Sequence, residues 1–404
     1  MKPIVRAGRM KPVHSDIRGP LFVEAMKRQK QGIDILKLNT GNPATFGFGL
    51  PDSIKNALME HMQDGVGYCD FKGMPQARQA ICDYETSKGI KGITPDDVFI
   101  GNGVSEVVSF ALTPLLNDGD EVLVPSPSYS LWGNSVYLED GKPVFYTCDE
   151  QANWYPDIQD IRSKITDKTK AIVIINPNNP TGVLYPKELL LEIIQIARES
   201  GLLIFADEIY DRLVMDGKQH ISLASLTEDV PVITLNGLSK SHCLCGYRCG
   251  WMVISGPREL TEDYRQGIIQ LTSLRLCANT MAQIVIPAAL DDMETPASMV
   301  PGGRIYEQRE ATVRELEKID GLSFVKNDAA FYVFPKLDVK KFNITNDKQF
   351  AHDLLDVTNI LLVPGSGFDW KDPDHFRIVM LPQADILSDA IRRMGTFLDG
   401  YKQK

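Results

Sequence analysis

The chain has 404 residues, of which 43% are hydrophobic and 24% are charged, and its net charge is −10. This length exceeds what one hydrophobic core usually organises, so we expect two unequal domains. The acidic balance argues against a nucleic-acid-binding surface, and no apolar run approaches the roughly 20 residues of a membrane helix. Seven cysteines at irregular spacings and the lack of a signal-peptide core predict a cytoplasmic protein.

Residues 1–45 are expected to form an N-terminal arm and part of the smaller domain. A short strand is predicted over 35–39, followed by a sharp turn at Thr40-Gly41-Asn42-Pro43. Helical patterns in the first hundred residues are found at 21–31, at 52–62 with Asp52 as a cap, and at 75–88.

Residues 46–295 are expected to form a large α/β domain, because from Val98 onwards apolar runs alternate with helical spans. The predicted strands are 98–100, 121–124, 171–175, 202–206, 232–235 and 250–254. The predicted helices between them include 106–116 and 186–199. Continuous apolar strands separated by helices indicate a mainly parallel sheet covered on both faces.

Residues 296–404 show a different pattern and are expected to form the smaller α+β domain. A long charged helix is predicted at 304–319, and a final helix near the C-terminus. The strands predicted in this part are 331–334, 360–363 and 376–379.

In parallel sheets, ligands bind beyond the carboxyl ends of the strands, so the residues that follow each strand are candidate site residues. Gly103-Val104-Ser105 opens a helix and could bind a phosphate with its backbone N–H groups, or it could be an ordinary turn and cap. Tyr129 follows a strand within a proline-rich loop and offers a flat face to a ring, although a packed aromatic is an equally common outcome.

Two further strand ends carry polar groups. The segment 176–182 reads Asn-Pro-Asn-Asn-Pro-Thr-Gly, and its two Asn-Pro steps restrict the backbone and aim amides such as that of Asn179 into the site. Asp207 ends the next strand and could hold a proton on a heterocyclic nitrogen, or it could simply cap a helix. Tyr210 could donate a hydrogen bond to a ring hydroxyl.

The stretch 235–251 brings one lysine, Lys240, and one arginine, Arg248, into a glycine-punctuated loop after a buried strand. A lysine held there could form an imine with a carbonyl compound, although a lysine after a strand is more often a solvated loop residue. Arg248 could hold a phosphate. Arg377 stands alone in an apolar strand and could clamp a substrate carboxylate, or pair internally.

Together these residues match what pyridoxal 5′-phosphate (PLP) requires, namely an imine-forming lysine, an acid for the pyridine nitrogen, a phosphate site and a stacking aromatic. A metal site at His242-Cys243-Leu244-Cys245 is disfavoured, because no second ligand pair lies at a suitable spacing and Lys240 and Arg248 flank the cluster. We therefore expect no metal.

The motifs Asn-Pro-Asn-Asn-Pro-Thr-Gly, Ala-Asp-Glu-Ile-Tyr and Ser-Lys-(x)7-Arg, in this order, resemble the class I aminotransferases of PLP fold type I, and the resemblance covers essentially the whole chain. It implies a seven-stranded large-domain sheet and an obligate homodimer with shared active sites. Several segments also resemble the alanine-type (glutamate–pyruvate) members. These segments are 16–20, 38–43, 67–70, 236–240, 275–279 and 301–304.

The resemblance implies a role for each matching residue. Lys240 carries PLP and shuttles the proton between the substrate Cα and the cofactor, while Asp207 pairs with the pyridine nitrogen. The remaining cofactor contacts are Tyr210 and Asn179 at the ring oxygen, Tyr129 against the ring, Gly103, Val104, Ser105, Ser239 and Arg248 around the phosphate, and Tyr68 reaching the phosphate of the other subunit. The substrate carboxylate is expected to meet Gly41, Asn179 and Arg377, and Arg18 of the arm is a hypothesis for closing the site.

Two positions depart from the family pattern. Gly237 stands where many relatives have a phosphate-binding serine, and Ser15 stands where an alanine-type arm is expected to have tyrosine. The expected activity is a ping-pong exchange of an amino group between L-alanine and 2-oxoglutarate. The alternatives are an aromatic, branched-chain or aspartate donor, a PLP-dependent carbon–sulfur lyase, and a regulator built on the same fold, which the short N-terminal segment and acidic charge disfavour.

Overall fold

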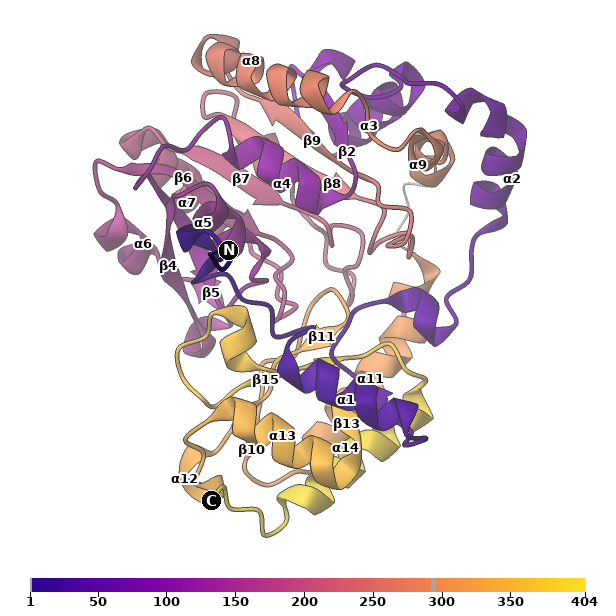
Figure 1. The fold of residues 1–404 in the computed structure, drawn as a ribbon, viewed down its shortest axis with the longest axis vertical. Helices are drawn as coiled ribbons and strands as arrows, with labels where there is room; N and C mark the ends of the chain where they lie inside the picture. The colour runs from indigo at the N-terminus through magenta and orange to yellow at the C-terminus, as the bar shows by residue number, and fades with distance from the viewer. Residues whose placement is uncertain (1, 292–295) are drawn as a thin grey trace.

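The computed structural model describes residues 2–291 and 296–404. Figure 1 shows two bodies, with the sheet strands β2 to β9 in the upper one and the elements from α11 onwards in the lower one, where α1 also lies. The boundary predicted between residues 295 and 296 falls at the edge of the described part, since residue 295 lies outside it.

The upper body is built on an eight-stranded sheet with strand order β2-β9-β8-β7-β6-β3-β4-β5. Its strands are β2 (Val98–Gly101), β3 (Glu121–Ser126), β4 (Lys142–Asp149), β5 (Tyr155–Pro156), β6 (Thr169–Ile175), β7 (Leu203–Asp207), β8 (Val232–Gly237) and β9 (Gly250–Ser255). The pairs from β4 through β3, β6 and β7 to β8 are parallel, whereas β2, β9 and β5 pair antiparallel.

The expected count of seven strands is therefore wrong by one, because the two-residue strand β5 extends the sheet beyond β4. Strand β4 itself is absent from the strands predicted from residue patterns. Its side chains alternate between buried and partly exposed near the sheet edge, so it lacks the continuous apolar run that marks the central strands. The central strand β8, in contrast, is buried along its whole length.

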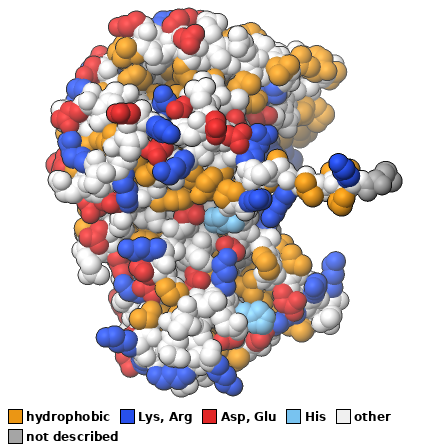
Figure 2. All heavy atoms as spheres, turned by 60° about the vertical axis from the view of Figure 1, so that its left-hand side comes forward, with side chains coloured by type: hydrophobic (Ala, Val, Ile, Leu, Met, Phe, Trp, Pro, Cys, Tyr) orange, Lys and Arg blue, Asp and Glu red, His pale blue; other side chains and the backbone are white. Residues whose placement is uncertain are grey.

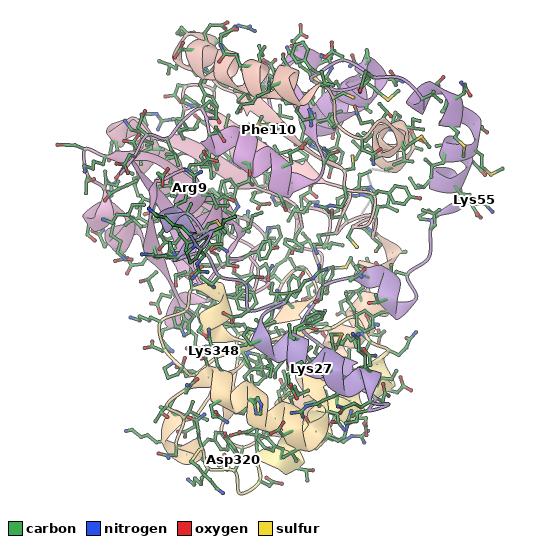
Figure 3. The ribbon with its side chains drawn as sticks, viewed as in Figure 1. Arg9, Lys27, Lys55, Phe110, Asp320 and Lys348 are labelled. Carbon is green, nitrogen blue, oxygen red and sulfur yellow. The ribbon has the colours of Figure 1, made fainter. Side chains whose placement is uncertain are left out.

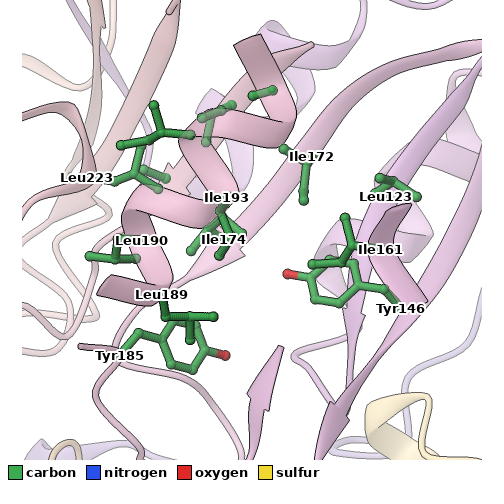
Figure 4. Packing of buried hydrophobic residues seen from close by; sticks show 14 of the residues in the cluster. Leu123, Tyr146, Ile161, Ile172, Ile174, Tyr185, Leu189, Leu190, Ile193 and Leu223 are labelled. Atoms are coloured by element: carbon green, nitrogen blue, oxygen red, sulfur yellow. The ribbon is translucent and has the colours of Figure 1, made fainter. Parts of the chain in front are cut away.

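Successive side chains of the central strands enter two different hydrophobic cores, as the twofold repeat of a strand requires. On β6, Ile172 and Ile174 pack with Leu190 and Ile193 of α7 (Lys187–Ser200), as Figure 4 shows. The alternate residues of β6 pack on the other face with α4 (Val104–Leu112), α5 (Leu131–Leu138) and α8 (Arg258–Arg275). The sheet is thus covered on both faces.

The other helices of the upper body lie close to their predicted positions where a prediction was made. They are α2 (Asp52–His61), α3 (Pro75–Ser87), α6 (Ile158–Lys164), α9 (Thr280–Ile284) and α10 (Ile286–Leu290). Two details differ: Pro51 occupies the N-cap of α2, so Asp52 is the first helical residue and not a cap. Helix α4 begins two residues earlier than expected, directly after Gly103, whose positive φ of 84° suits glycine.

The lower body combines short strands with four longer helices and the short helix α12. The helices are α1 (Pro20–Lys30), α11 (Arg304–Leu316), α12 (Val339–Phe342), α13 (Asp347–Thr358) and α14 (Ala384–Leu398). The strands are β1 (Leu36–Lys37), β10 (Leu322–Ser323), β11 (Tyr332–Val333), β12 (Lys336–Leu337), β13 (Ile360–Leu361), β14 (Val363–Pro364) and β15 (Phe376–Val379). The single strand predicted at 360–363 is divided, because its first half pairs with β1 and its second half with β15.

The N-terminal segment is joined to the lower body by β1, which pairs parallel with β13. We propose on this basis that residues 1–45 and 296–404 form one small domain and residues 46–295 the large one. Arg9, labelled in Figure 3, bridges to Asp140 at 2.9 Å and holds the arm against the end of α5. Beyond this contact the chain end projects from the surface, with Ile4 and Val5 exposed (Figure 2).

Among the described residues, no single helix is long and apolar enough to cross a membrane. Helix α8 together with 280–290 passes a test of length and composition, but the two segments are bent by 118° relative to each other.

Candidate active site

Several of the predicted site residues lie where the carboxyl ends of β6, β7 and β8 approach the lower body. The parallel register of these strands places Ile175, Asp207 and Leu235 side by side, so the loops that follow them emerge at one edge. From the small domain, Arg377 on β15 donates a hydrogen bond of 2.9 Å to the Oδ1 of Asn179, which lies in the loop after β6. A direct side-chain contact of this kind therefore links the upper and lower bodies at the site.

Lys240 is half-buried, and its Nζ donates a hydrogen bond of 3.0 Å to the carbonyl of Gly41 in the N-terminal segment. Gly41 is closely surrounded: a Cβ there would lie 2.8 Å from Cε2 of Phe331 and would overlap the hydroxyl of Tyr332. The backbone can reach the lysine only because this residue lacks a side chain. The hydrogen bond to Gly41 thus positions the amine of Lys240, and the half-buried side chain remains accessible to a carbonyl compound.

Asp207 ends β7 and is buried, with 5% of its surface exposed. Its Oδ2 accepts a hydrogen bond of 3.0 Å from the indole N–H of Trp132, whereas its Oδ1 has only a long contact of 3.4 Å with the N–H of Ile209. Burial raises the pKa of this carboxyl to about 6, against the effect of the two hydrogen bonds. A cationic N–H placed beside Asp207 would stabilise the ionised carboxylate.

Tyr210 lies three residues further along the same loop and is also buried. Its hydroxyl lies 3.1 Å from the hydroxyl of Tyr332 and 3.4 Å from the amide nitrogen of Asn179. Burial raises the pKa of Tyr210 well above its usual value, so the phenol remains protonated and able to donate a hydrogen bond at neutral pH. Tyr332, which comes from β11, is not among the residues predicted from sequence.

Arg377 is 1% exposed and lies between two aromatic rings, with its guanidinium carbon 4.6 Å from the centroids of both Tyr332 and Phe368. Besides its bond to Asn179, it donates to the carbonyl of Asn39. Its Nε is buried without a hydrogen-bond partner in the structure. In the part of the chain that the structure describes, no carboxylate forms an ion pair with this buried guanidinium, so an incoming carboxylate would compensate its charge.

Arg248 lies close to Gly103 at the start of α4, where the sequence predicts a phosphate site. A Cβ on Gly103 would lie 2.8 Å from the guanidinium carbon of Arg248, so the arginine lies directly against the helix N-terminus. The N–H groups at the start of α4 and the guanidinium therefore converge on the same space. Ser105 lies exposed in the first turn and Ser239 is half-buried beside Lys240.

The departure at Gly237 has a steric reason. A Cβ at this position would lie 2.6 Å from the carbonyl oxygen of Cys249 and 3.0 Å from the Cα of Gly250, both on the neighbouring strand β9. Such contacts with backbone cannot be relieved by a rotamer change. The close approach of β8 and β9 therefore leaves no room for a serine hydroxyl here.

Four other residues singled out in the sequence lie exposed. Tyr129 has 36% and Tyr68 has 83% of its surface exposed. Arg18 and Ser15 are exposed in the arm, although the adjacent Ile17 accepts a hydrogen bond of 2.8 Å from the side chain of Asn39. The hydrogen bonds that Lys240, Asn179 and Arg377 form do not include these four side chains.

Proteins similar to this chain are known. The family described as aminotransferase class I and II matches residues 33–391, which is most of the chain. The chain belongs to this family. The resemblance found in the motifs is confirmed, and class I aminotransferases are PLP-dependent enzymes that act on amino acids and 2-oxo acids.

Among its relatives, this aminotransferase is 50% identical to the glutamate-pyruvate aminotransferase AlaA of Haemophilus influenzae over the full length of both chains. A solved aminotransferase from Escherichia coli is 47% identical, covers 100% of both chains and superposes with a TM-score of 0.98. The alanine aminotransferase of Pyrococcus furiosus is 40% identical over 98% of this chain and 100% of its own, with a TM-score of 0.91.

Sequence patterns missed three residues that shape the site of this aminotransferase. Trp132, Tyr332 and Asn39 contact Asp207, Tyr210 and Arg377, respectively. A tryptophan three residues after Tyr129 was a usable signal, because a buried indole N–H needs an acceptor. Tyr332 and Asn39 lie in segments that read as ordinary strand ends, and only the folded chain brings them to the site.

Proposed function

We propose that this aminotransferase transfers the amino group between L-alanine and 2-oxoglutarate, with PLP bound at Lys240. The proposal for the substrates is supported by full-length relatives named for glutamate, pyruvate and alanine. The observation that carries the proposal for the cofactor is the presence of two buried groups of opposite charge, Asp207 and Arg377, at the site. Within residues 2–291 and 296–404, Asp207 forms no ion pair with a cation and Arg377 forms none with a carboxylate.

The residues of this chain fit PLP on three points. The raised pKa of Asp207 fits a carboxyl whose natural partner is a protonated ring nitrogen. The space between Gly103 and Arg248 is suited to a phosphate, which accepts bonds from helix N–H groups and from a guanidinium. Lys240 supplies the amine. When bound, PLP supplies an electron sink that stabilises negative charge at the substrate Cα.

Each residue then has a distinct task. Arg377 and the amide of Asn179 bind the α-carboxylate of the amino acid, and so fix the orientation of its Cα. Lys240, which lies beside the carbonyl of Gly41, is placed to take the proton from Cα and would deliver that proton to the cofactor. With PLP bound, Tyr210 and Asn179 would donate hydrogen bonds to its ring oxygen, and Tyr129 would cover its face.

The arm is proposed to close the site over a small substrate. Arg377 donates to the carbonyl of Asn39, and the side chain of Asn39 donates to the carbonyl of Ile17. These two hydrogen bonds connect Arg377 through Asn39 to Ile17, the residue before Arg18. Binding of a carboxylate at Arg377 would therefore affect the position of Arg18. An arginine at the entrance also suits the second carboxylate of 2-oxoglutarate.

We propose that the enzyme is a cytoplasmic homodimer in which Tyr68 reaches the phosphate site of the partner subunit. The proposal is supported by a group of exposed large side chains near Tyr68 in the sequence and at the end of α8, since such side chains mark protein interfaces. These side chains are Met59, Met62, Val66, Tyr68, Leu274 and Leu276. Analytical ultracentrifugation of the purified protein tests the dimer, and a monomer with full activity would refute it.

The decisive experiment is an absorbance spectrum of the purified protein before and after addition of L-alanine. A visible band of bound PLP that disappears with L-alanine and returns with 2-oxoglutarate would support both halves of the reaction. A band that responds only to an aromatic, branched-chain or acidic amino acid would retain the mechanism and change the donor. Release of ammonia and a 2-oxo acid from a sulfur amino acid would favour the lyase, and a protein that binds no PLP would refute the proposal.

A further inference from the structure

A lysine at the end of α3 is enclosed by three carboxylates behind the loop that follows β7. The Nζ of Lys88 lies 2.8 Å from Glu85, 2.7 Å from Glu208 and 3.1 Å from Asp211. All three carboxylates are buried, and the side chain of Lys88 is only 13% exposed. A buried cluster of this kind is costly to desolvate, so it requires an explanation beyond surface ion pairing.

We call residues 207–211 the acidic turn. In this turn Asp207 and Tyr210, which are expected to contact the cofactor, are each followed by a residue whose carboxylate contacts Lys88. Asp207 bonds to Trp132 in the site, while the next residue, Glu208, bonds to Lys88. Likewise, Tyr210 lies beside Asn179 and Tyr332, while Asp211 bonds to Lys88. One ammonium group therefore holds both rear side chains of the acidic turn.

The same cluster is tied to the strand that leads to Lys240. Asp211 accepts hydrogen bonds of 2.7 Å from the amide of Asn236 and 2.6 Å from the hydroxyl of Tyr84. Asn236 lies in β8, and its Oδ1 accepts the N–H of Gly237, three residues before the lysine. A displacement of Asp211 would therefore affect both the acidic turn and the loop of Lys240.

The charge balance of the cluster depends on Lys88. Burial raises the pKa of Glu85, which also accepts a hydrogen bond from the indole of Trp251, and burial lowers the pKa of the neighbouring His220. The ammonium of Lys88 therefore faces the carboxylates of Glu208 and Asp211 as well as Glu85, which binds its proton more tightly than an exposed glutamate does. Tyr84, whose pKa is raised by burial, remains a neutral donor. Removal of the ammonium would leave two buried negative charges with only hydrogen bonds to support them.

We propose that Lys88 is a positioning residue of this transaminase. It holds the rear side chains of the acidic turn, and so fixes the directions in which Asp207 and Tyr210 face the cofactor ring. The inference rests on the proposed PLP-dependent function. It differs from a purely structural role, because replacing a buried ion pair by apolar groups can leave stability unchanged while the precise placement of neighbouring groups is lost.

The test compares Lys88→Met, Lys88→Arg and the double variant Lys88→Met/Glu208→Gln with wild type. The double variant has the same net charge in the cluster as wild type, since it removes one positive and one negative group. Lys91→Met is the control, because Lys91 is exposed on the surface and its ammonium lies 2.8 Å from the equally exposed Glu228. The readouts are the dissociation constant of PLP from the apoenzyme between about pH 6 and pH 9, the pH dependence of the bound-PLP absorbance, and kcat separately from KM.

We expect the dissociation constant of PLP for Lys88→Met to be at least about tenfold higher than that of wild type at pH 8. The loss should diminish at pH 6, because carboxylates without their cation have a raised pKa and take up a proton. The Arg variant should bind PLP as wild type does, and the double variant should recover part of the affinity and lose the pH dependence.

Three outcomes would overturn the inference. The first is a Lys88→Met protein that matches wild type and the Lys91→Met control in all readouts. The second, should Lys88→Met fail to fold, is a folded double variant with wild-type PLP affinity, absorbance profile and kcat, since the lysine would then serve folding alone. The third is a Lys88→Met protein that binds PLP weakly with the same loss at every pH. If wild type itself binds no PLP, the proposed function fails instead.

Discussion

Replacement of Asp207 by asparagine should stabilise the PLP-free enzyme while it abolishes function. The side chain is buried without a cation, and its pKa lies at about 6 instead of the usual 3.8. Because the folded pKa is the higher one, the stability connected with this proton is complete below about pH 3.8 and is lost as the pH rises through about 6. Asparagine is neutral throughout and avoids that loss.

The magnitude follows from the difference between the two pKa values. A difference of about two pKa units corresponds to about 3 kcal/mol at a pH well above both values, at 1.36 kcal/mol for each unit. The amide oxygen of asparagine can still accept the indole N–H of Trp132, so the hydrogen bond of 3.0 Å is retained. The variant should therefore gain stability at about pH 8, and the gain should vanish towards about pH 4.

The assay is urea unfolding of PLP-free wild type and of the asparagine variant at fixed protein concentration over this pH range. Asp372→Asn, which changes an exposed carboxylate, controls for the loss of one negative charge. Added PLP should stabilise wild type and leave the Asp207→Asn variant nearly unchanged, and the variant should lose transaminase activity. A variant that is no more stable than wild type at about pH 8, or a gap of equal size at both ends of the range, would refute the reasoning.

Three further predictions concern close packing and the arm. Gly41→Ala should cost about 1–3 kcal/mol of stability and most of the activity, because the added methyl group overlaps two aromatic side chains, whereas Gly49→Ala meets nothing within 4 Å and should match wild type in thermal unfolding and kcat. Gly237→Ser should lower PLP affinity in equilibrium dialysis despite its added hydroxyl, because the new Cβ lies 2.6 Å from the carbonyl of Cys249; tighter binding would contradict the steric account. Arg18→Ala should raise the KM for 2-oxoglutarate and leave PLP binding intact, and unchanged kinetics would reject its closing role.

The central strands could be predicted because their physical signal is local. Strands β6 and β8 are continuous apolar runs, since both of their faces are buried. Strands β4 and β5, at one end of the sheet, carry no such run, and β5 forms only through its pairing with β4. The division of the predicted strand 360–363 between two partners depends on where β1 and β15 lie, which no local pattern records.

The sequence by itself determined the chemical groups of the site and their order along the chain. Asp207 ends β7, and Lys240 and Arg248 lie in the loop that follows β8; the topology of a parallel sheet places such positions at one edge. The tertiary structure alone decided what surrounds them. Arg377 meets Asn179 across the domain boundary, and Lys88 lies behind the acidic turn, because charges and close contacts act through space between residues far apart in the chain.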